Sequence, residues 1–322
     1  MALEGLGADF QSVACCESDD SCRQIIQMNF KTKRLFTDLC ADARRMPTSD
    51  IFVAGPPCQP FSAENRGQGR GVQDPRADPF ISAIEAIEHS APKCFLLENV
   101  KGIRQGKNKA FFLMVMKALR DMEAGGQRYE VSFKTLDCKH FGLPQSRPRI
   151  WILGLRRDVV QTPFLWPRKM KPVSVVRFLD PWTSGVDMHG GLPPLSQKVA
   201  RANVIEAIRM IRKNGHDETR ATYIANIDGS KVHIMHNMSP CLTAKRMADG
   251  GHWIVSRGRR MTLQEGMRLQ GIPPSRIKIG SVRRRRVAHM VGNGMSLPVL
   301  QAIFRQISKA APSAFRFQRF GD

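Results

Sequence analysis

Cys58 is the residue whose type and position are best suited to chemistry. It follows a short apolar run, 51–54, which predicts a buried strand, and Gly55, Pro56 and Pro57 end that strand abruptly. Because two consecutive prolines fix the backbone and remove two N–H donors, the thiol lies in a stiff turn. Such a cysteine can be a nucleophile when nearby cations or N–H groups stabilise its thiolate. A free thiol in a loop is the alternative that this stretch alone leaves open.

Three acidic residues are predicted at the same edge of a sheet as Cys58. Glu17 and Glu98 come at the ends of apolar runs, and Asp38 lies in the loop that precedes the Cys58 strand. In a parallel sheet, ligands bind beyond the carboxyl ends of the strands. The sequence therefore predicts a site that combines one thiol with three carboxylates.

Strands and helices alternate over the first half of the chain. Apolar runs predict strands near 13–16, 51–54, 93–97, 129–135 and 149–155. Helical spacing predicts helices at 21–29, 79–87 and 110–122. This alternation indicates βαβ units, and hence an α/β fold with a parallel sheet.

Beyond Arg156 the pattern becomes irregular. Many prolines and glycines interrupt it. The segment 220–260 is basic, rich in turns and contains only short apolar runs. Helices are expected again at 203–211, at 262–269 and from about 297. We expect a first α/β domain over 1–155, a smaller irregular domain over 156–258, and a return to the first domain over 259–322.

The charge of the chain is strongly positive. Its 50 Lys and Arg exceed its 28 Asp and Glu, which gives a formal net charge of +22. This excess predicts a polyanionic partner such as nucleic acid, and a ribosomal or otherwise supercharged surface is the alternative. The run Arg283 to Arg286 is typical of a solvated face and is also compatible with phosphate contacts.

The cysteines indicate a reduced, intracellular protein without a metal site. All eight are scattered, with neither Cys-x-x-Cys pairs nor a disulfide framework. His233, His236 and Cys241 lie close together, but no fourth ligand follows at a usual spacing.

The sequence also predicts no membrane association. No apolar run approaches the roughly 18–20 residues of a membrane span, and the N-terminus lacks a secretory signal. We expect a monomer in the nucleus of a eukaryote, or in the cytoplasm or nucleoid of a bacterium.

Six stretches, taken in chain order, resemble the motifs of the C5-cytosine-specific DNA methyltransferase family. They are 55–62, 98–100 (Glu-Asn-Val), 145–149 (Gln-Ser-Arg-Pro-Arg), 239–251, 260–273 and 292–299. Each alone is weak or moderate evidence, but their order extends across nearly the whole chain. The resemblance implies a Rossmann-like, S-adenosylmethionine-dependent methyltransferase sheet, with 156–258 as the target-recognition domain.

The resemblance implies covalent catalysis on cytosine. Cys58 would attack carbon 6, and Glu98, kept partly protonated by burial, would hold ring N3 and the exocyclic amine. Arg149 would lie against the base and Cys58, with Arg147 nearer the phosphates. Because the reacting carbons are stacked inside a duplex, the base must flip out.

The resemblance also assigns cofactor residues. Glu17 would bind the ribose hydroxyls of S-adenosylmethionine and Asp38 the adenine amine. Asn293 would lie near the methionine part, and Pro57 would line the adenosine pocket.

Contacts to double-stranded DNA are expected from two places. One is a mobile loop over 62–76, rich in Gly and Arg, for which a disordered basic loop is the alternative. The other is the end of the recognition region. The expected DNA-binding residues are Gln59, Ser62, Arg66, Arg70, Thr243, Gly250 and Gly251.

The chain departs from the family pattern at its start. The family begins with a strand and a glycine loop, whereas Met1 to Gly7 resembles the middle and end of the following helix. We therefore expect that strand and most of the loop to be absent, as in a fragment or a degenerate copy. Two alternatives remain: an inactive relic that only binds DNA, and an RNA cytosine-5 methyltransferase, although the tRNA-directed branch's Cys-Phe-Thr signature is not found.

Overall fold

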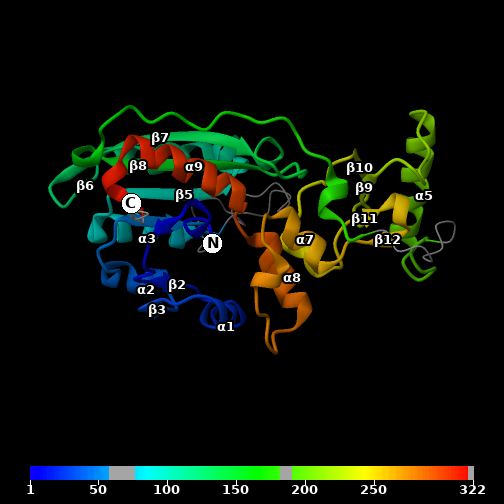
Figure 1. The fold of residues 1–322 in the computed structure, drawn as a ribbon, viewed down its shortest axis with the longest axis horizontal. Helices are drawn as coiled ribbons and strands as arrows, with labels where there is room; N and C mark the ends of the chain where they lie inside the picture. The colour runs from blue at the N-terminus through cyan, green and yellow to red at the C-terminus, as the bar shows by residue number, and fades with distance from the viewer. Residues whose placement is uncertain (58–76, 182–190, 318–322) are drawn as a thin grey trace, which may run out of the picture. The chain divides into compact units, whose positions relative to one another are not determined.

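The computed structural model describes residues 1–57, 77–181 and 191–317 of the 322-residue chain (Figure 1). The chain divides into two compact units. The first comprises 1–136, 148–168 and 299–322, and the second comprises 137–147 and 169–298. That 156–258 reads the target remains a prediction.

A five-stranded sheet forms the centre of the first unit, in the order β4-β5-β8-β7-β6. Its strands are β4 (Ile51–Ala54), β5 (Cys94–Val100), β6 (Glu123–Ala124), β7 (Gln127–Asp137) and β8 (Pro148–Arg156). β4 and β5 are parallel, as the alternating pattern predicts.

The prediction of a parallel sheet is wrong for β8, which runs antiparallel to β5. A parallel crossover needs a dozen or more residues and usually a helix. The connection from β7 to β8 spans only 138–147 and contains just a short 3-10 turn, Cys138–His140. β8 therefore returns beside β7 in the opposite direction, and the sheet is mixed.

Helices cover the sheet because each has one apolar stripe. α3 (Asp78–Ser90) and α4 (Lys109–Asp121) bury aromatic and aliphatic side chains against the apolar residues of β5 and β8. In α4 the buried residues Phe111, Val115 and Leu119 recur every four residues. α9 (Leu297–Ala310) lies on the opposite side of the sheet from α3 (Figure 1).

A small parallel pair, β2 (Cys15–Cys16) and β3 (Leu35–Phe36), adds a further βαβ element to the first unit. α1 (Asp20–Asn29) connects the two strands, and Asp19 caps it by accepting a hydrogen bond from the Cys22 amide at 3.1 Å. The short helix α2 (Leu39–Asp42) follows β3. At the chain start, η1 (Glu4–Leu6) precedes β1 (Ala8–Asp9), which pairs with β13 (Arg316–Phe317).

The second unit contains an antiparallel sheet that the sequence pattern did not predict. Its order is β10 (His233–His236), β9 (Tyr223–Asn226), β11 (Trp253–Ile254) and β12 (Arg259–Arg260). Its helices are α5 (Lys198–Lys213), α6 (Ala244–Ala248), α7 (Leu263–Leu269) and α8 (Arg284–Asn293). α7 begins with a capping box between Thr262 and Glu265, which explains why its start was predictable.

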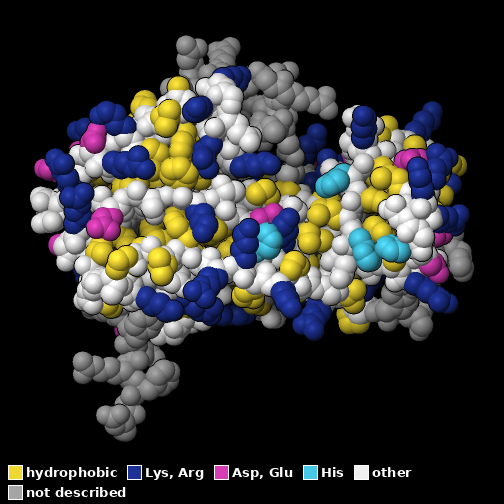
Figure 2. Space-filling model, turned by 90° about the horizontal axis from the view of Figure 1, so that it is seen from above, with side chains coloured by type: hydrophobic (Ala, Val, Ile, Leu, Met, Phe, Trp, Pro, Cys, Tyr) yellow, Lys and Arg dark blue, Asp and Glu magenta, His cyan; other side chains and the backbone are white. Residues whose placement is uncertain are grey.

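The charged side chains on the face seen in Figure 2 are mostly cations. On the face seen in Figure 2, Lys and Arg side chains are spread over the molecule, with few acidic side chains among them. Among the described residues, no helix has the length and apolar character needed to cross a membrane.

Candidate functional site

The turn that leads to Cys58 is tied to β5 through Asn99. This side chain is 1% exposed, and its Nδ2 donates to the Pro56 carbonyl at 3.2 Å. Its Oδ1 accepts from the Val100 amide at 2.9 Å. Because both ends of the amide are bonded, its orientation is fixed, and the end of β4 is held to β5. Sequence reasoning assigned no role to Asn99, although its place beside Glu98 was a signal.

Several predicted residues lie outside the described part of the chain. They are Cys58, Gln59, Ser62, Arg66 and Arg70. Pro57, which precedes Cys58, is described and half-buried. The roles expected for these residues stay predictions.

Glu98 and Arg149 form an ion pair on one face of the first unit's sheet. The register pairs Val100 with Arg149 and Glu98 with Trp151. Since side chains alternate between faces along a strand, Arg149 lies on the same face as Glu98, diagonally across from it. The Arg149 Nε is 3.1 Å from the Glu98 Oε1, and both side chains are largely buried.

This contact adds a partner that the sequence did not suggest for Glu98. The contact fixes the orientation of the Glu98 carboxyl group. The pair places an acid and a cation side by side, where both can form hydrogen bonds to a polar ring.

Glu17 and Asp38 lie at the carboxyl ends of two paired strands. β2 and β3 are in register at Cys16 and Phe36, and Glu17 and Asp38 follow each strand closely. The Glu17 amide donates to the Phe36 carbonyl at 3.1 Å, which fixes the two strand ends side by side. The structure thus brings together the two acids predicted to bind the cofactor.

Each of these acids also has a local structural role. Glu17 Oε1 accepts from the Asp19 amide at 2.9 Å, and Asp38 caps α2 by accepting from the Cys40 amide at 2.9 Å. Their negative charges also affect the pKa of the neighbouring thiol, Cys16. Burial, followed by the charges of nearby carboxylates, raises the pKa of Cys16 to about 11.

The described cysteines with strongly raised pKa values are poor nucleophiles. Burial raises the pKa of both Cys94 and Cys138 to about 12. Both therefore remain protonated near neutral pH, and a thiol is far less nucleophilic than a thiolate.

Arg147 is buried inside the second unit, and this differs from its expected place near phosphates. It is 2% exposed. Its Nη1 donates to the Leu242 carbonyl at 2.7 Å, and its Nη2 donates to the carbonyls of Gly292 and Gly294 at 3.1 and 2.8 Å. The guanidinium therefore joins two loops by backbone contacts instead of pointing at solvent.

Two buried glutamines also connect segments of this unit through hydrogen bonds to the backbone. Gln145 is fully buried, donates to the Leu269 carbonyl at 2.9 Å and accepts from the Leu242 amide at 3.0 Å. Gln270 donates to the Val291 carbonyl at 2.9 Å. We name Gln145, Arg147 and Gln270 the polar hub. It holds the end of α8, where Asn293 is exposed.

The predicted DNA-binding residues of the second unit lie around α6. Thr243 caps this helix by accepting from the Arg246 amide at 3.4 Å. Gly250 and Gly251 follow the helix with φ of 101° and 75°, a left-handed conformation that favours glycine. Their residue types are thus explained by a turn, and DNA contact by them stays a prediction.

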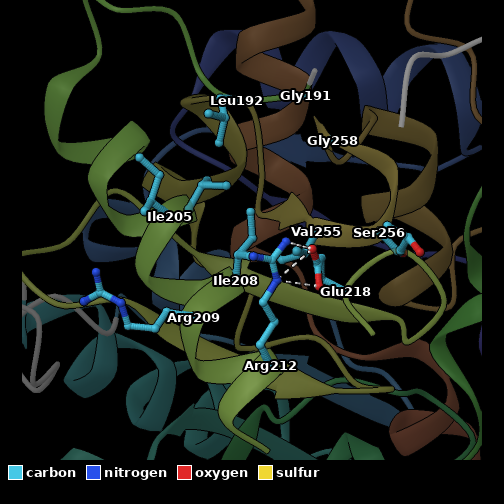
Figure 3. Close-up of a pocket in the computed structure, with 12 residues that line it drawn as sticks. Gly191, Leu192, Ile205, Ile208, Arg209, Arg212, Glu218, Val255, Ser256 and Gly258 are labelled. Atoms are coloured by element: carbon cyan, nitrogen blue, oxygen red, sulfur yellow. Dashed lines mark hydrogen bonds and ion pairs between the residues drawn. The ribbon is translucent and has the colours of Figure 1, made fainter. Parts of the chain in front are cut away.

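The second unit also contains a cavity of about 480 Å³ beside α5. Figure 3 shows the apolar side chains Leu192, Ile205 and Ile208 around it, with Arg212 bonded to Glu218 at its edge. Of the predicted site residues that the structure describes, none lines this cavity.

Comparison with protein families gives a match over almost the whole chain. Residues 1–309 match the family model of the C-5 cytosine-specific DNA methylases. The Type II methyltransferase M.NgoBI of Neisseria gonorrhoeae is 30% identical over 318 residues, covering 97% of this chain and 92% of its own. M.HaeII of Haemophilus aegyptius is 29% identical over 320 residues, covering 94% and 88%.

Solved structures share the fold. A putative DNA modification methyltransferase encoded within a prophage of E. coli has a TM-score of 0.64 at 18% identity, covering 95% of each chain. The Dnmt2 methyltransferase of S. pombe has a TM-score of 0.57 at 17% identity, covering 96% of this chain and 93% of its own. At these identities the likeness establishes the fold alone.

Proposed function

This chain belongs to the C-5 cytosine-specific DNA methylase family and is a DNA (cytosine-5) methyltransferase, and we propose that it works through a covalent adduct between Cys58 and cytosine. The observation that carries this proposal is the ion pair between Glu98 of β5 and Arg149 of β8, because β5 also holds the turn that leads to Cys58 through Asn99. A polar ring bound there would meet an acid and a cation, on the strand to which the turn before Cys58 is tied.

The proposed chemistry begins at carbon 6. Carbon 5 of cytosine is a weak nucleophile until the Cys58 thiolate adds to carbon 6 and pushes electron density towards it. Glu98 in its protonated form donates to N3 and accepts from the exocyclic amine, and Arg149 orients Glu98 and favours the thiolate. After methyl transfer, removal of the carbon 5 proton expels the thiolate and restores the ring.

S-adenosylmethionine is the proposed methyl donor, and it supplies an electrophilic sulfonium methyl group when bound. Glu17 and Asp38 fit its adenosine part, since two carboxylates at neighbouring strand ends can accept from ribose hydroxyls and an adenine amine. Asn293 and Pro57 complete the proposed set. Residues of 156–258 are proposed to read the DNA bases.

A duplex that carries 5-fluorocytosine tests the covalent step. Because fluorine at carbon 5 is not removed as a proton, an adduct formed at carbon 6 persists after methyl transfer. We expect the wild-type chain with S-adenosylmethionine to form a complex that survives denaturing electrophoresis. Cys58→Ser should form none, and the control Cys40→Ser, at an exposed position, should trap normally. Normal trapping by Cys58→Ser would refute the assignment of the nucleophile.

Two alternatives predict other results. A relic that only binds DNA would retain duplex affinity without any adduct in the wild type. An RNA cytosine-5 methyltransferase would be trapped on a fluorinated tRNA and not on the duplex.

A further inference from the structure

Residues 266–298 are a strongly basic stretch of the second unit. They contain seven Lys and Arg and no Asp or Glu. Four of the seven, Arg283 to Arg286, are consecutive and exposed, and we name them the arginine cluster. The other three are Arg268, Arg276 and Lys278, of which Arg276 and Lys278 are also exposed.

The fold fixes where the arginine cluster lies. Three of its residues form the first turn of α8, and Arg283 precedes them as the cap residue. α8 is anchored by its buried residues Val287, Ala288, Val291 and Gly292. The cluster is therefore displayed on an ordered helix.

The stretch that contains the arginine cluster, 266–298, supplies no acid of its own. Asp249 lies 3.1 Å from the Nη2 of Arg285, which is 75% exposed. Arg284 donates to the neutral Gln264 at 3.3 Å. Arg285 thus has a carboxylate partner, whereas the partner of Arg284 is neutral.

Other arginines of this unit are used differently. Arg246 and Arg260 both bind Asp228, at 2.7 and 2.6 Å. Burial alone would raise the pKa of Asp228, but the hydrogen bonds from these arginines lower it. Arg259 likewise binds the fully buried Glu265 at 2.7 Å. At these two positions the guanidinium groups are neutralised by acids within the unit.

The position of the cluster works against stability. The first turn of a helix carries a partial positive charge from its free N–H groups, so cations there are unfavourable. Four neighbouring guanidinium groups also repel one another. A sequence feature that conflicts with local folding is expected where function requires it.

We propose that the arginine cluster, with Arg276 and Lys278, binds the phosphodiester backbone of duplex DNA. Guanidinium groups bind phosphate oxygens with strong, often bidentate hydrogen bonds. Such contacts hold a protein on DNA without reading its sequence. The inference rests on DNA as the substrate of this family and does not depend on the covalent chemistry of Cys58.

The test is equilibrium binding to duplex DNA without S-adenosylmethionine, at several salt concentrations, so that catalysis is not required. In the first variant, Arg283, Arg284, Arg285 and Arg286 all become Gln. Each lost phosphate contact should reduce the salt slope by about 0.9, so we expect a slope smaller by about 2–4. Affinity at low salt should fall at least about 10-fold. The thermal midpoint should stay the same or rise, because cations leave the start of a helix.

Two controls make the result specific. Changing Lys107, Lys109, Lys117 and Arg120 to Gln removes the same charge near α4 of the first unit, and should leave the salt slope within about one phosphate contact of the wild type. Changing the four arginines to Lys keeps the charge and should keep most of the affinity. An unchanged slope in the glutamine variant, an equal loss in the α4 control, or an equal loss in the lysine variant would each overturn the proposal. Trapping on fluorinated DNA remains a separate test of the Cys58 chemistry.

Discussion

Glu98 and Arg149 show how single residues acquire a function from their surroundings. Each type is common in a chain with this charge, and only the register of β5 and β8 brings them within 3.1 Å. In the proposed mechanism the carboxyl group must hold a base while Arg149 fixes its orientation.

Replacing Glu98 tests its proposed part in the chemistry. Glu98→Gln keeps the size of the side chain but removes the acid, so we expect kcat to fall by roughly 10²–10⁴-fold. Duplex affinity should change little, because the phosphates supply most of it. Single-turnover methyl transfer measures the rate. The control Glu88→Gln, on the exposed side of α3, should match the wild type. Equal rates for the two variants would remove Glu98 from the mechanism.

His252 predicts a specific pH dependence of stability. It is 1% exposed, and burial lowers its pKa to about 4 although its Nε2 lies 3.2 Å from the Cys241 carbonyl. An unfolded histidine has a pKa near 6.5. Between these values the unfolded chain binds more protons, so the free energy of unfolding falls as the pH falls from about 6.5 to about 4.

Urea unfolding between pH 7.5 and 5 measures this effect. Within the window His252 should contribute about 1.4 kcal/mol per pH unit, approached gradually near its upper end. His252→Gln should reduce the pH dependence by that amount. If both proteins lose stability in parallel, the buried neutral histidine is not its source.

At the scale of elements, the polar hub and the packing of two helices fix the turn that carries Asn293. A Cβ added to Gly292 would lie 2.4 Å from the Thr243 carbonyl oxygen, because α8 closely approaches the start of α6. At Gly294, an added Cβ would meet no atom closer than 3.6 Å. These two glycines therefore provide a matched pair.

Gly292→Ala should destabilise the protein by about 1–3 kcal/mol, because backbone must move to admit the methyl group. Gly294→Ala should be nearly neutral. If Asn293 contacts the cofactor, Gly292→Ala should also weaken binding of S-adenosylhomocysteine, measured by calorimetry. Equal stability of the two variants would show that the helices do not meet as closely as described.

The sequence predicted the longer elements well and the long-range contacts poorly. α4 and β5 were predictable because each carries a continuous apolar pattern of one period. The sheet β9 to β12 was missed because its strands have two to four residues, too few to establish alternation. The burial of Arg147 was missed because its carbonyl partners come 95 to 147 residues later. Cys58 was predicted from its turn and its motif, which need no long-range information, and its role stays a prediction.

At the scale of the whole molecule, a net charge of +22 and membership of the methylase family both predict binding to DNA. A chain of this charge is attracted to any polyanion, so affinity alone cannot distinguish a methyltransferase from a DNA-binding relic or an RNA enzyme. The chemistry must be measured.

The most direct measurement is transfer of labelled methyl groups from S-adenosylmethionine to unmethylated duplex DNA, with tRNA in parallel. We expect label in the duplex only, recovered as 5-methylcytosine after digestion, and none with Cys58→Ser. A wild-type chain that binds duplex DNA but transfers no label to it would contradict the proposed function.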